Sequence, residues 1–229
     1  MLVLNPKISI LLTSYNNPDV ERAIKSILNQ TYQNFEIILL DDNSSDPKVL
    51  EILEKYKKHS KIKFYNSQIK EEDRLKECPY ARQINVGLKM ATGKLITYMC
   101  DDVEYLPRKL EIMVKFLKRH PTVKVCYGQQ KWIREETGEV VRILKPDRIL
   151  KDPFKKVDHN SVMHYKSCID KVGNWDTSAL GMADAYFWQK LGKKYPFYPI
   201  KEILEIHYRN PRCFSNKVKK MWKEKYEKN

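Results

Sequence analysis

The chain has 229 residues, 42% of them hydrophobic, which is enough for one large α/β domain with a core of its own. Its formal net charge of +14 favours polyanionic partners, namely nucleic acid, an anionic membrane or phosphate-bearing substrates, and does not choose among them. No apolar run approaches the ~18 residues of a membrane span, and the run at 8–12 is too short for a signal peptide, so we expect a cytoplasmic protein.

Strand and helix alternate through the first 130 residues. Buried apolar runs predict strands at 7–13, 35–40, 62–65, 95–99 and 123–127. Apolar residues at helical spacing predict helices at 19–30, 49–56, 80–90 and 110–117. Regular alternation of this kind indicates a parallel sheet with helices on both faces.

The rhythm changes after residue 130. A hairpin is predicted at 132–144, with Thr137 and Gly138 as its turn. Beyond it we expect a strand at 157–164, a helix at 183–191 and a strand at 203–208. The second part of the chain is therefore expected to be a smaller, mixed region.

Paired carboxylates follow two of the predicted strands, Asp41-Asp42 and Asp101-Asp102, and Asp158 stands at a third strand edge. Either pair alone is often only a turn or helix-capping feature. Ligands of open parallel sheets bind beyond the carboxyl ends of the strands, so two pairs on one rim favour a shared cation. Carboxylates with phosphates completing the shell suit Mg²⁺ or Mn²⁺.

The sequence contains neither a Walker A motif nor GxGxxG, the two glycine-rich phosphate cradles. A sheet of this type with acids in place of glycines suggests that phosphate is held through a metal and basic side chains.

Several segments together resemble a family 2 glycosyltransferase of the GT-A fold. They are the opening stretches 8–16, 23–32 and 36–44, the helix 81–88 with 91–94, the acidic motif 101–102, and the later blocks 172–176 and 183–188. The resemblance covers roughly residues 7–215. Within the family it is greatest to the glycosyltransferases of bacterial spore-coat polysaccharide biosynthesis, through 96–98, 158–164 and 195–199.

The resemblance implies a GT-A fold, a mostly parallel central sheet with helices on both faces and a smaller mixed acceptor-side region. Residues 1–130 would form the nucleotide-sugar-binding half and 131–215 the acceptor-binding half of the same domain. Residues 216–229 would be a basic C-terminal tail with six lysines and two glutamates. That tail is either a solvated terminal helix or a peripheral contact with the inner face of an anionic membrane.

The resemblance also implies roles on the donor side. Thr13, Tyr15, Asp42, Arg74 and Asp101 would bind the nucleotide, with Asp42 accepting a hydrogen bond from uracil or thymine. Asp102 would ligate Mn²⁺ or Mg²⁺, with Glu104 or His207 as alternative ligands. The acidic motif reads Asp-Asp-Val-Glu and not a spaced Asp-x-Asp, so Glu104 is retained as an alternative metal ligand.

On the acceptor side, Asp184 would be the general base that takes the proton from the attacking hydroxyl. Ala183 precedes it where the family often has a glutamate. Four further residues are expected to face the acceptor: Asp158, His159, Trp175 and Asp176.

The implied function is inverting transfer from a UDP- or dTDP-sugar to a saccharide or other hydroxyl acceptor, in surface polysaccharide synthesis, without a nucleic-acid partner. A nucleotidyltransferase acting on sugar phosphates is an alternative, but it needs a glycine-rich basic motif after the first strand, and 13–18 contains no glycine. A nucleic-acid-binding module would account for the +14 charge and the 14 tyrosines, but no RRM, KH or zinc signature is present.

Overall fold

The computed structural model describes residues 5–74, 76–145, 147–179 and 181–209. The predicted tail, 216–229, lies outside these residues, so its contact with a membrane stays a prediction. Within the described ranges, no helix has the length and apolar character needed to cross a membrane.

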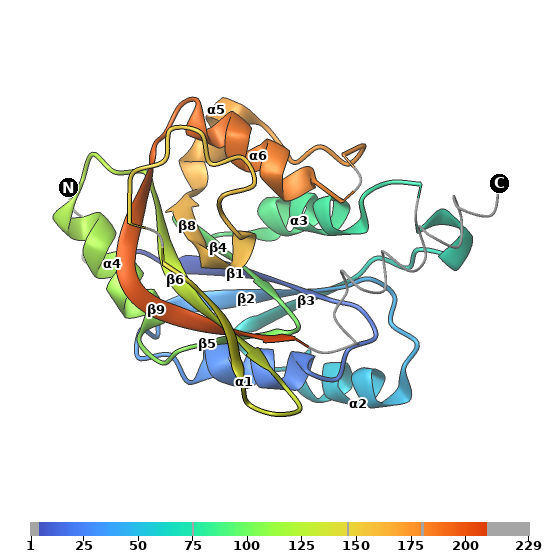
Figure 1. The fold of residues 1–229 in the computed structure, drawn as a ribbon. Helices are drawn as coiled ribbons and strands as arrows, with labels where there is room; N and C mark the ends of the chain where they lie inside the picture. The colour runs from blue at the N-terminus through green and yellow to red at the C-terminus, as the bar shows by residue number, and fades with distance from the viewer. Residues whose placement is uncertain (1–4, 75, 146, 180, 210–229) are drawn as a thin grey trace.

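Nine strands of the described chain form one sheet in the order β3-β2-β1-β4-β8-β6-β9-β5, with β7 paired to β6 (Figure 1). The strands are β1 (Ile8–Ser14), β2 (Phe35–Asp41), β3 (Ile62–Asn66), β4 (Leu95–Cys100), β5 (Val103–Tyr105), β6 (Val125–Arg134), β7 (Val140–Leu144), β8 (Val162–Tyr165) and β9 (Phe197–Arg209). The helices are α1 (Val20–Leu28), α2 (Pro47–Tyr56), α3 (Pro79–Met90), α4 (Lys109–Arg119), α5 (Ile169–Val172) and α6 (Ala183–Gly192).

The first half is the predicted parallel sheet. β1 pairs in parallel with both β2 and β4, and β2 pairs in parallel with β3. All seven residues of β1 and of β2 are buried, as expected of strands covered on both faces. Their carboxyl ends therefore meet along one edge of the sheet.

Helices cover both faces of this sheet (Figure 1). Alternate β1 side chains point to opposite sides, so Ile10 and Leu12 pack in the cluster with α1, α2 and α4, whereas Leu11 packs in the cluster with α3 and α6. Gly93 lets the chain leave α3 close to β1, because a Cβ there would lie 2.5 Å from the Ser9 nitrogen.

The second half is mixed. β8 runs antiparallel between β4 and β6, while β9 pairs in parallel with β6 and antiparallel with β5. The predicted 123–127 strand is thus not a direct neighbour of β4, and the predicted hairpin is formed by β6 and β7. The long, curved β9 brings Val103 of β5 opposite His207.

The prediction of a strand at 157–164 is wrong in its first part. The Asp158 side chain accepts a hydrogen bond from the Asn160 nitrogen, which closes a 3-10 turn over His159–Ser161, and β8 begins only at Val162. His159 and His164 therefore do not share a strand.

Candidate active site

A pocket lies where β1, β2 and β4 end, with about 330 Å³ of empty volume that includes its open mouth. Four of the predicted nucleotide-binding residues line it: Thr13, Tyr15, Asp42 and Asp101. The remaining lining residues are Ser14, Pro79, Tyr80, Gln83 and Cys100. The parallel register puts these side chains at one edge, as the sequence predicted.

Asp42 is the anionic centre of one wall. Its buried carboxylate forms ion pairs with Nη1 of Arg74 and, at 2.9 Å, with Nη2 of Arg82. Arg74, 2% exposed, also lies over the Tyr15 ring, with its guanidinium carbon 3.9 Å from the ring centroid. Arg74, which comes from a stretch rich in charged residues at 70–77, thus lies behind the pocket lining, where it links Asp42 to Tyr15.

Asp41 has a different environment from Asp42. Its carboxylate accepts hydrogen bonds from the Ser44 nitrogen at 2.9 Å, the Ser44 hydroxyl at 2.6 Å and the Asn66 amide at 2.8 Å. Burial raises the pKa of Asp41. This aspartate closes the turn after β2 and does not line the pocket.

Asp101 holds the loop after β1. Its Oδ2 accepts from the Tyr15 backbone nitrogen and its Oδ1 from the Asn17 amide, each at 3.0 Å. The loop after β1 is also joined to the loop after β2, because Oδ1 of Asn16 accepts a hydrogen bond from the Ser45 nitrogen at 2.7 Å. The pocket is therefore preorganised by hydrogen bonds between its own loops.

Asp102 stands at the junction of β4 and β5. Its backbone oxygen accepts from the Tyr208 nitrogen at 3.1 Å, which places it beside the end of β9. Among residues 5–209 with their three gaps, no hydrogen bond or ion pair engages the Asp102 carboxylate. Glu104, by contrast, accepts a hydrogen bond from the Tyr208 hydroxyl.

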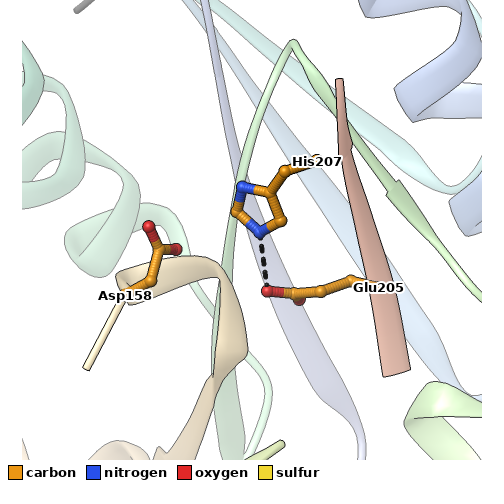
Figure 2. Close-up of side chains that lie close together, drawn as sticks. All are labelled: Asp158, Glu205 and His207. Atoms are coloured by element: carbon orange, nitrogen blue, oxygen red, sulfur yellow. Dashed lines mark hydrogen bonds and ion pairs between the residues drawn. The ribbon is translucent and has the colours of Figure 1, made fainter. Parts of the chain in front are cut away.

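Figure 2 shows a cluster of Asp158, Glu205 and His207, whose possible ligand atoms all lie within 4.8 Å of one another. Nε2 of His207 is 3.0 Å from Oε1 of Glu205, and the ring stacks on Trp132 at 4.4 Å between centroids. Burial lowers the pKa of His207, but the carboxylates of Asp158 and Glu205 outweigh it and raise the pKa above its usual value.

Glu205 is less available to a metal than Asp102, because three side chains already contact its carboxylate. Its carboxylate is fully buried, forms an ion pair with Lys109 and accepts from the Gln130 amide at 2.5 Å. Among the described residues, the Asp102 carboxylate and His207 Nδ1 make no such contacts, and carboxylate oxygen and imidazole nitrogen are ligand types that divalent cations accept. The electrostatic influence of Asp102 reaches His207, where it also raises the pKa.

Asp184 lies in the first turn of α6, with 35% of its side chain exposed. Its Oδ2 is 3.9 Å from Nδ1 of His159, and Nε2 of the same ring is 3.0 Å from Sγ of Cys100. Since Cys100 lines the pocket, this contact chain runs from the strand ends to α6.

The other two acceptor-side candidates lie in the loop before α6. Trp175 is 2% exposed and stacks on Phe187, with ring centroids 4.5 Å apart. Asp176 is exposed and accepts from the nitrogen and hydroxyl of Ser178 at 2.9 and 2.7 Å, which forms a local turn. Trp175 therefore packs in the aromatic core, and Asp176 shapes the loop.

The profile of a family described as glycosyl transferase family 2 matches residues 9–172. The chain belongs to this family. It is 35% identical to Protein CgeD of Bacillus subtilis over 224 residues, which is 93% of this chain and 52% of CgeD. The chain thus spans about half the length of that relative.

Solved structures show the same fold. S. aureus TarS 1-349 in complex with UDP-GlcNAc superposes with a TM-score of 0.74 at 17% identity, over 91% of this chain and 60% of that one. The mannosyltransferase PcManGT from Pyrobaculum calidifontis, in complex with GDP-Man and Mn²⁺, gives a TM-score of 0.66 at 16% identity, over 93% and 59%. The predicted GT-A fold and family 2 membership are confirmed.

Sequence reasoning missed the buried polar residues beneath this family 2 site. Lys109 contacts Glu205 and donates to the Asn160 oxygen at 2.6 Å, with its ammonium 3.5 Å from the Tyr105 ring centroid. One sequence signal was present, because Lys109 shares the helical face of buried Met113. Glu205 gave none, since a glutamate between Leu204 and Ile206 is the ordinary pattern of a solvent-facing strand position.

Proposed function

We propose that this protein transfers a sugar from a UDP- or dTDP-sugar to a hydroxyl group of a saccharide or other acceptor, with inversion at the anomeric carbon, in surface polysaccharide synthesis. The observation that carries the proposal is that three groups lie near the ends of the parallel strands. They are the Asp42–Arg74 ion pair, the Asp102 carboxylate and the Asp184 carboxylate. A pocket at the strand ends, a carboxylate without a side-chain partner among the described residues and a part-exposed carboxylate are the features that such a transfer needs.

On the donor side, Thr13 and Tyr15 line the space for the base. A carboxylate offers about four lone-pair sites, so Asp42 retains acceptor capacity for the N3–H of uracil or thymine beside its two arginine partners. Arg74 orients Asp42 and neutralises it, and Asp101 fixes the loop that carries Tyr15. The UDP-GlcNAc in the TarS structure supports a UDP-sugar as the first donor to test.

Asp102 and His207 would hold a divalent cation, Mn²⁺ or Mg²⁺, with Glu104 the next candidate ligand. Such a cation neutralises the charge that develops on the departing nucleoside diphosphate. The presence of Mn²⁺ with a nucleotide sugar in PcManGT supports this assignment.

On the acceptor side, Asp184 removes the proton from the acceptor hydroxyl while its oxygen attacks the anomeric carbon. The bond from that carbon to the nucleoside diphosphate breaks on the opposite side, so a single displacement inverts the configuration, by analogy with inverting hydrolases. The acceptor lies in the half formed by 131–215, with Asp158 and His159 at its inner edge.

Nucleotide-dependent thermal stability tests the donor assignment. UDP or dTDP should raise the melting temperature more than GDP or ADP does, and more still with Mn²⁺, because a ligand of the folded state stabilises it by mass action. In Asp42→Ala the preference for UDP should largely disappear, because no side-chain oxygen remains there to accept from the base, whereas Asp176→Ala, which removes an exposed carboxylate, should retain it. Equal shifts with GDP, ADP and UDP in the unmodified protein would exclude a pyrimidine donor.

A further inference from the structure

The His159 ring lies between the end of β4 and the start of α6. Its Nε2 is 3.0 Å from Cys100 Sγ, and its Nδ1 is 3.9 Å from Oδ2 of Asp184. The Tyr80 ring of α3 packs against it, with centroids 4.7 Å apart and an interplanar angle of 45°. Only 15% of the His159 side chain is exposed, so three elements restrict where this ring can point.

The backbone that carries His159 is itself anchored to β4. Oδ1 of Asn160 accepts a hydrogen bond from the Cys100 nitrogen at 2.7 Å, and the Asn160 nitrogen donates to Asp158 at 2.9 Å. The ring is thus fixed through both its side-chain and main-chain neighbours. Because Nε2 of the ring contacts Cys100 of β4, the position of β4 also fixes where Nδ1 lies beside Asp184.

The chemistry of the ring assigns a proton to Nδ1. The 3.9 Å between Nδ1 and Oδ2 of Asp184 is an ion-pair distance, and a carboxylate only accepts hydrogen bonds, so the two groups attract each other when Nδ1 carries a proton. Burial opposes the charged ring, but Cys100, Asp158 and Asp184 outweigh it and hold the pKa of His159 well above its usual value. In the charged ring both nitrogens carry a proton, so Nδ1–H then faces Asp184.

We propose that His159 is a positioning residue for the general base: with Cys100 behind it, its Nδ1–H orients the part-exposed Asp184 carboxylate towards the acceptor hydroxyl. The inference rests on the function proposed above, in which Asp184 takes the acceptor proton. Proton transfer is efficient only when the base is held within hydrogen-bond reach of its proton.

This arrangement also joins the two substrate sites. Cys100 lines the donor pocket and immediately precedes Asp101, which holds the Tyr15 loop. The orientation of Asp184 on α6 therefore depends on the end of β4, which also shapes the donor pocket. Loss of His159 should accordingly lower turnover while leaving the donor pocket intact.

A double-mutant cycle separates positioning from a structural role. We would measure UDP release from UDP-GlcNAc, with water and with a panel of p-nitrophenyl glycosides as acceptors, for His159→Leu, Asp184→Asn and the double variant. His159→Leu should lower kcat by about 10- to 100-fold, a part of the usual worth of positioned proton transfer, with KM for the donor nearly unchanged. In the Asp184→Asn background it should cost almost nothing more, because residues that act through one another are not additive.

Two matched variants complete the cycle. His159→Asn places an amide N–H near the position of Nδ1 and should restore most of the turnover that His159→Leu loses. His120→Leu, at the C-terminal end of α4, should leave kcat unchanged.

The outcomes distinguish the two proposals. Normal UDP release in Asp184→Asn would overturn the proposed base itself. A strong loss in Asp184→Asn, with His159→Leu either normal or multiplying that loss, would leave the base in place and overturn the role of His159.

A spectroscopic readout decides the matter even if no tested acceptor supports turnover. The chain has five histidines, so imidazole ¹⁵N signals are few, and the His159 signals are those lost in His159→Asn. Asp184→Asn and Cys100→Ala should each shift them, in proteins whose melting temperature confirms folding. His159 signals that do not move in Asp184→Asn would overturn the proposal.

Discussion

Four aspartates stand at the ends of β2 and β4, and they differ in the groups that contact their carboxylates. Asp41 and Asp101 accept hydrogen bonds from neighbouring loops and hold the pocket in shape. Asp42 is neutralised by two arginines. The carboxylate of Asp102 has no such partner in the part of the chain described, which makes it the member with capacity for a cation.

Substitution of Asp102 tests this division. Asp102→Asn removes a charged ligand with little change of volume, so Mn²⁺ should no longer strengthen UDP binding, while binding without metal should stay the same. Isothermal titration calorimetry with and without Mn²⁺ measures both, and Asp176→Asn serves as the carboxylate control. Undiminished metal dependence would place the cation elsewhere, with Glu104 examined next.

At this scale the sequence predicted which residues gather at the strand ends, but not the contacts that each of them makes. Asp42, Asp101 and Tyr15 could be grouped because parallel strands end at one edge. The role of each aspartate depends on which loop nitrogens reach it, as with Ser44 at Asp41, and no spacing rule gives that. Nor could the contact of His159 with Asp184 be predicted, since it joins residues far apart in sequence.

At the scale of elements, one buried ion pair joins α4 to β9. Lys109 and Glu205 are both completely inaccessible to solvent, and Glu205 in turn contacts His207. The pair therefore sets the position of β9 beside the metal-site candidates.

Lys109→Met should lower the free energy of unfolding by about 3–5 kcal/mol, because it leaves the Glu205 charge buried without its cation. Adding Glu205→Gln should recover part of this loss, since no unpaired charge then remains. Urea unfolding of the single and double variants measures both effects. A Lys109→Met protein as stable as the unmodified one would show that the pair does not anchor α4.

A second element-scale clamp fastens β1 and β2 to the segment after α3. Glu36 accepts from the Ser9 hydroxyl and the Thr92 nitrogen, each at 2.6 Å, and pairs with Lys7 and Lys63 at 2.9 and 3.0 Å. Burial raises the pKa of Glu36, but these four partners outweigh it and bring the pKa well below its usual 4.5.

The clamp should therefore make stability depend on pH. A carboxyl group with a lowered pKa in the folded state contributes fully above the unfolded value and loses this contribution as pH falls towards the folded one. At pH 7, Glu36→Gln should be less stable by about 1.5–3 kcal/mol, the worth of a hydrogen bond to a charged group. Urea unfolding from pH 7 to pH 3 should show the difference narrowing below about pH 4.5; a gap independent of pH would contradict this.

The elements themselves were predictable to different degrees. β1, β2 and β4 were predicted because their apolar runs are buried on both faces. β5 has only three residues and pairs with a strand more than a hundred positions later, so no local pattern marks it. The predicted strand from Val157 failed because Asp158 caps a turn there.

At the scale of the molecule, the parallel strands and the mixed strands form one sheet and join where β4 pairs with β8. The parallel strands supply the pocket at their carboxyl ends and the acidic motif. β9 returns His207 to the same edge, and α6 brings Asp184 near His159, which contacts Cys100. The groups that the proposed transfer assigns to donor and acceptor thus belong to one family 2 domain and lie around the end of β4.

The anomeric configuration of the product tests the central claim most directly. With an α-linked UDP-sugar as donor and an acceptor that supports turnover, ¹H NMR of the product reports the configuration through the coupling constant at the anomeric proton. One displacement assisted by Asp184 predicts a β-linked product, formed about 10²–10⁴-fold more slowly by Asp184→Asn. An α-linked product, or near-normal turnover in Asp184→Asn, would contradict it.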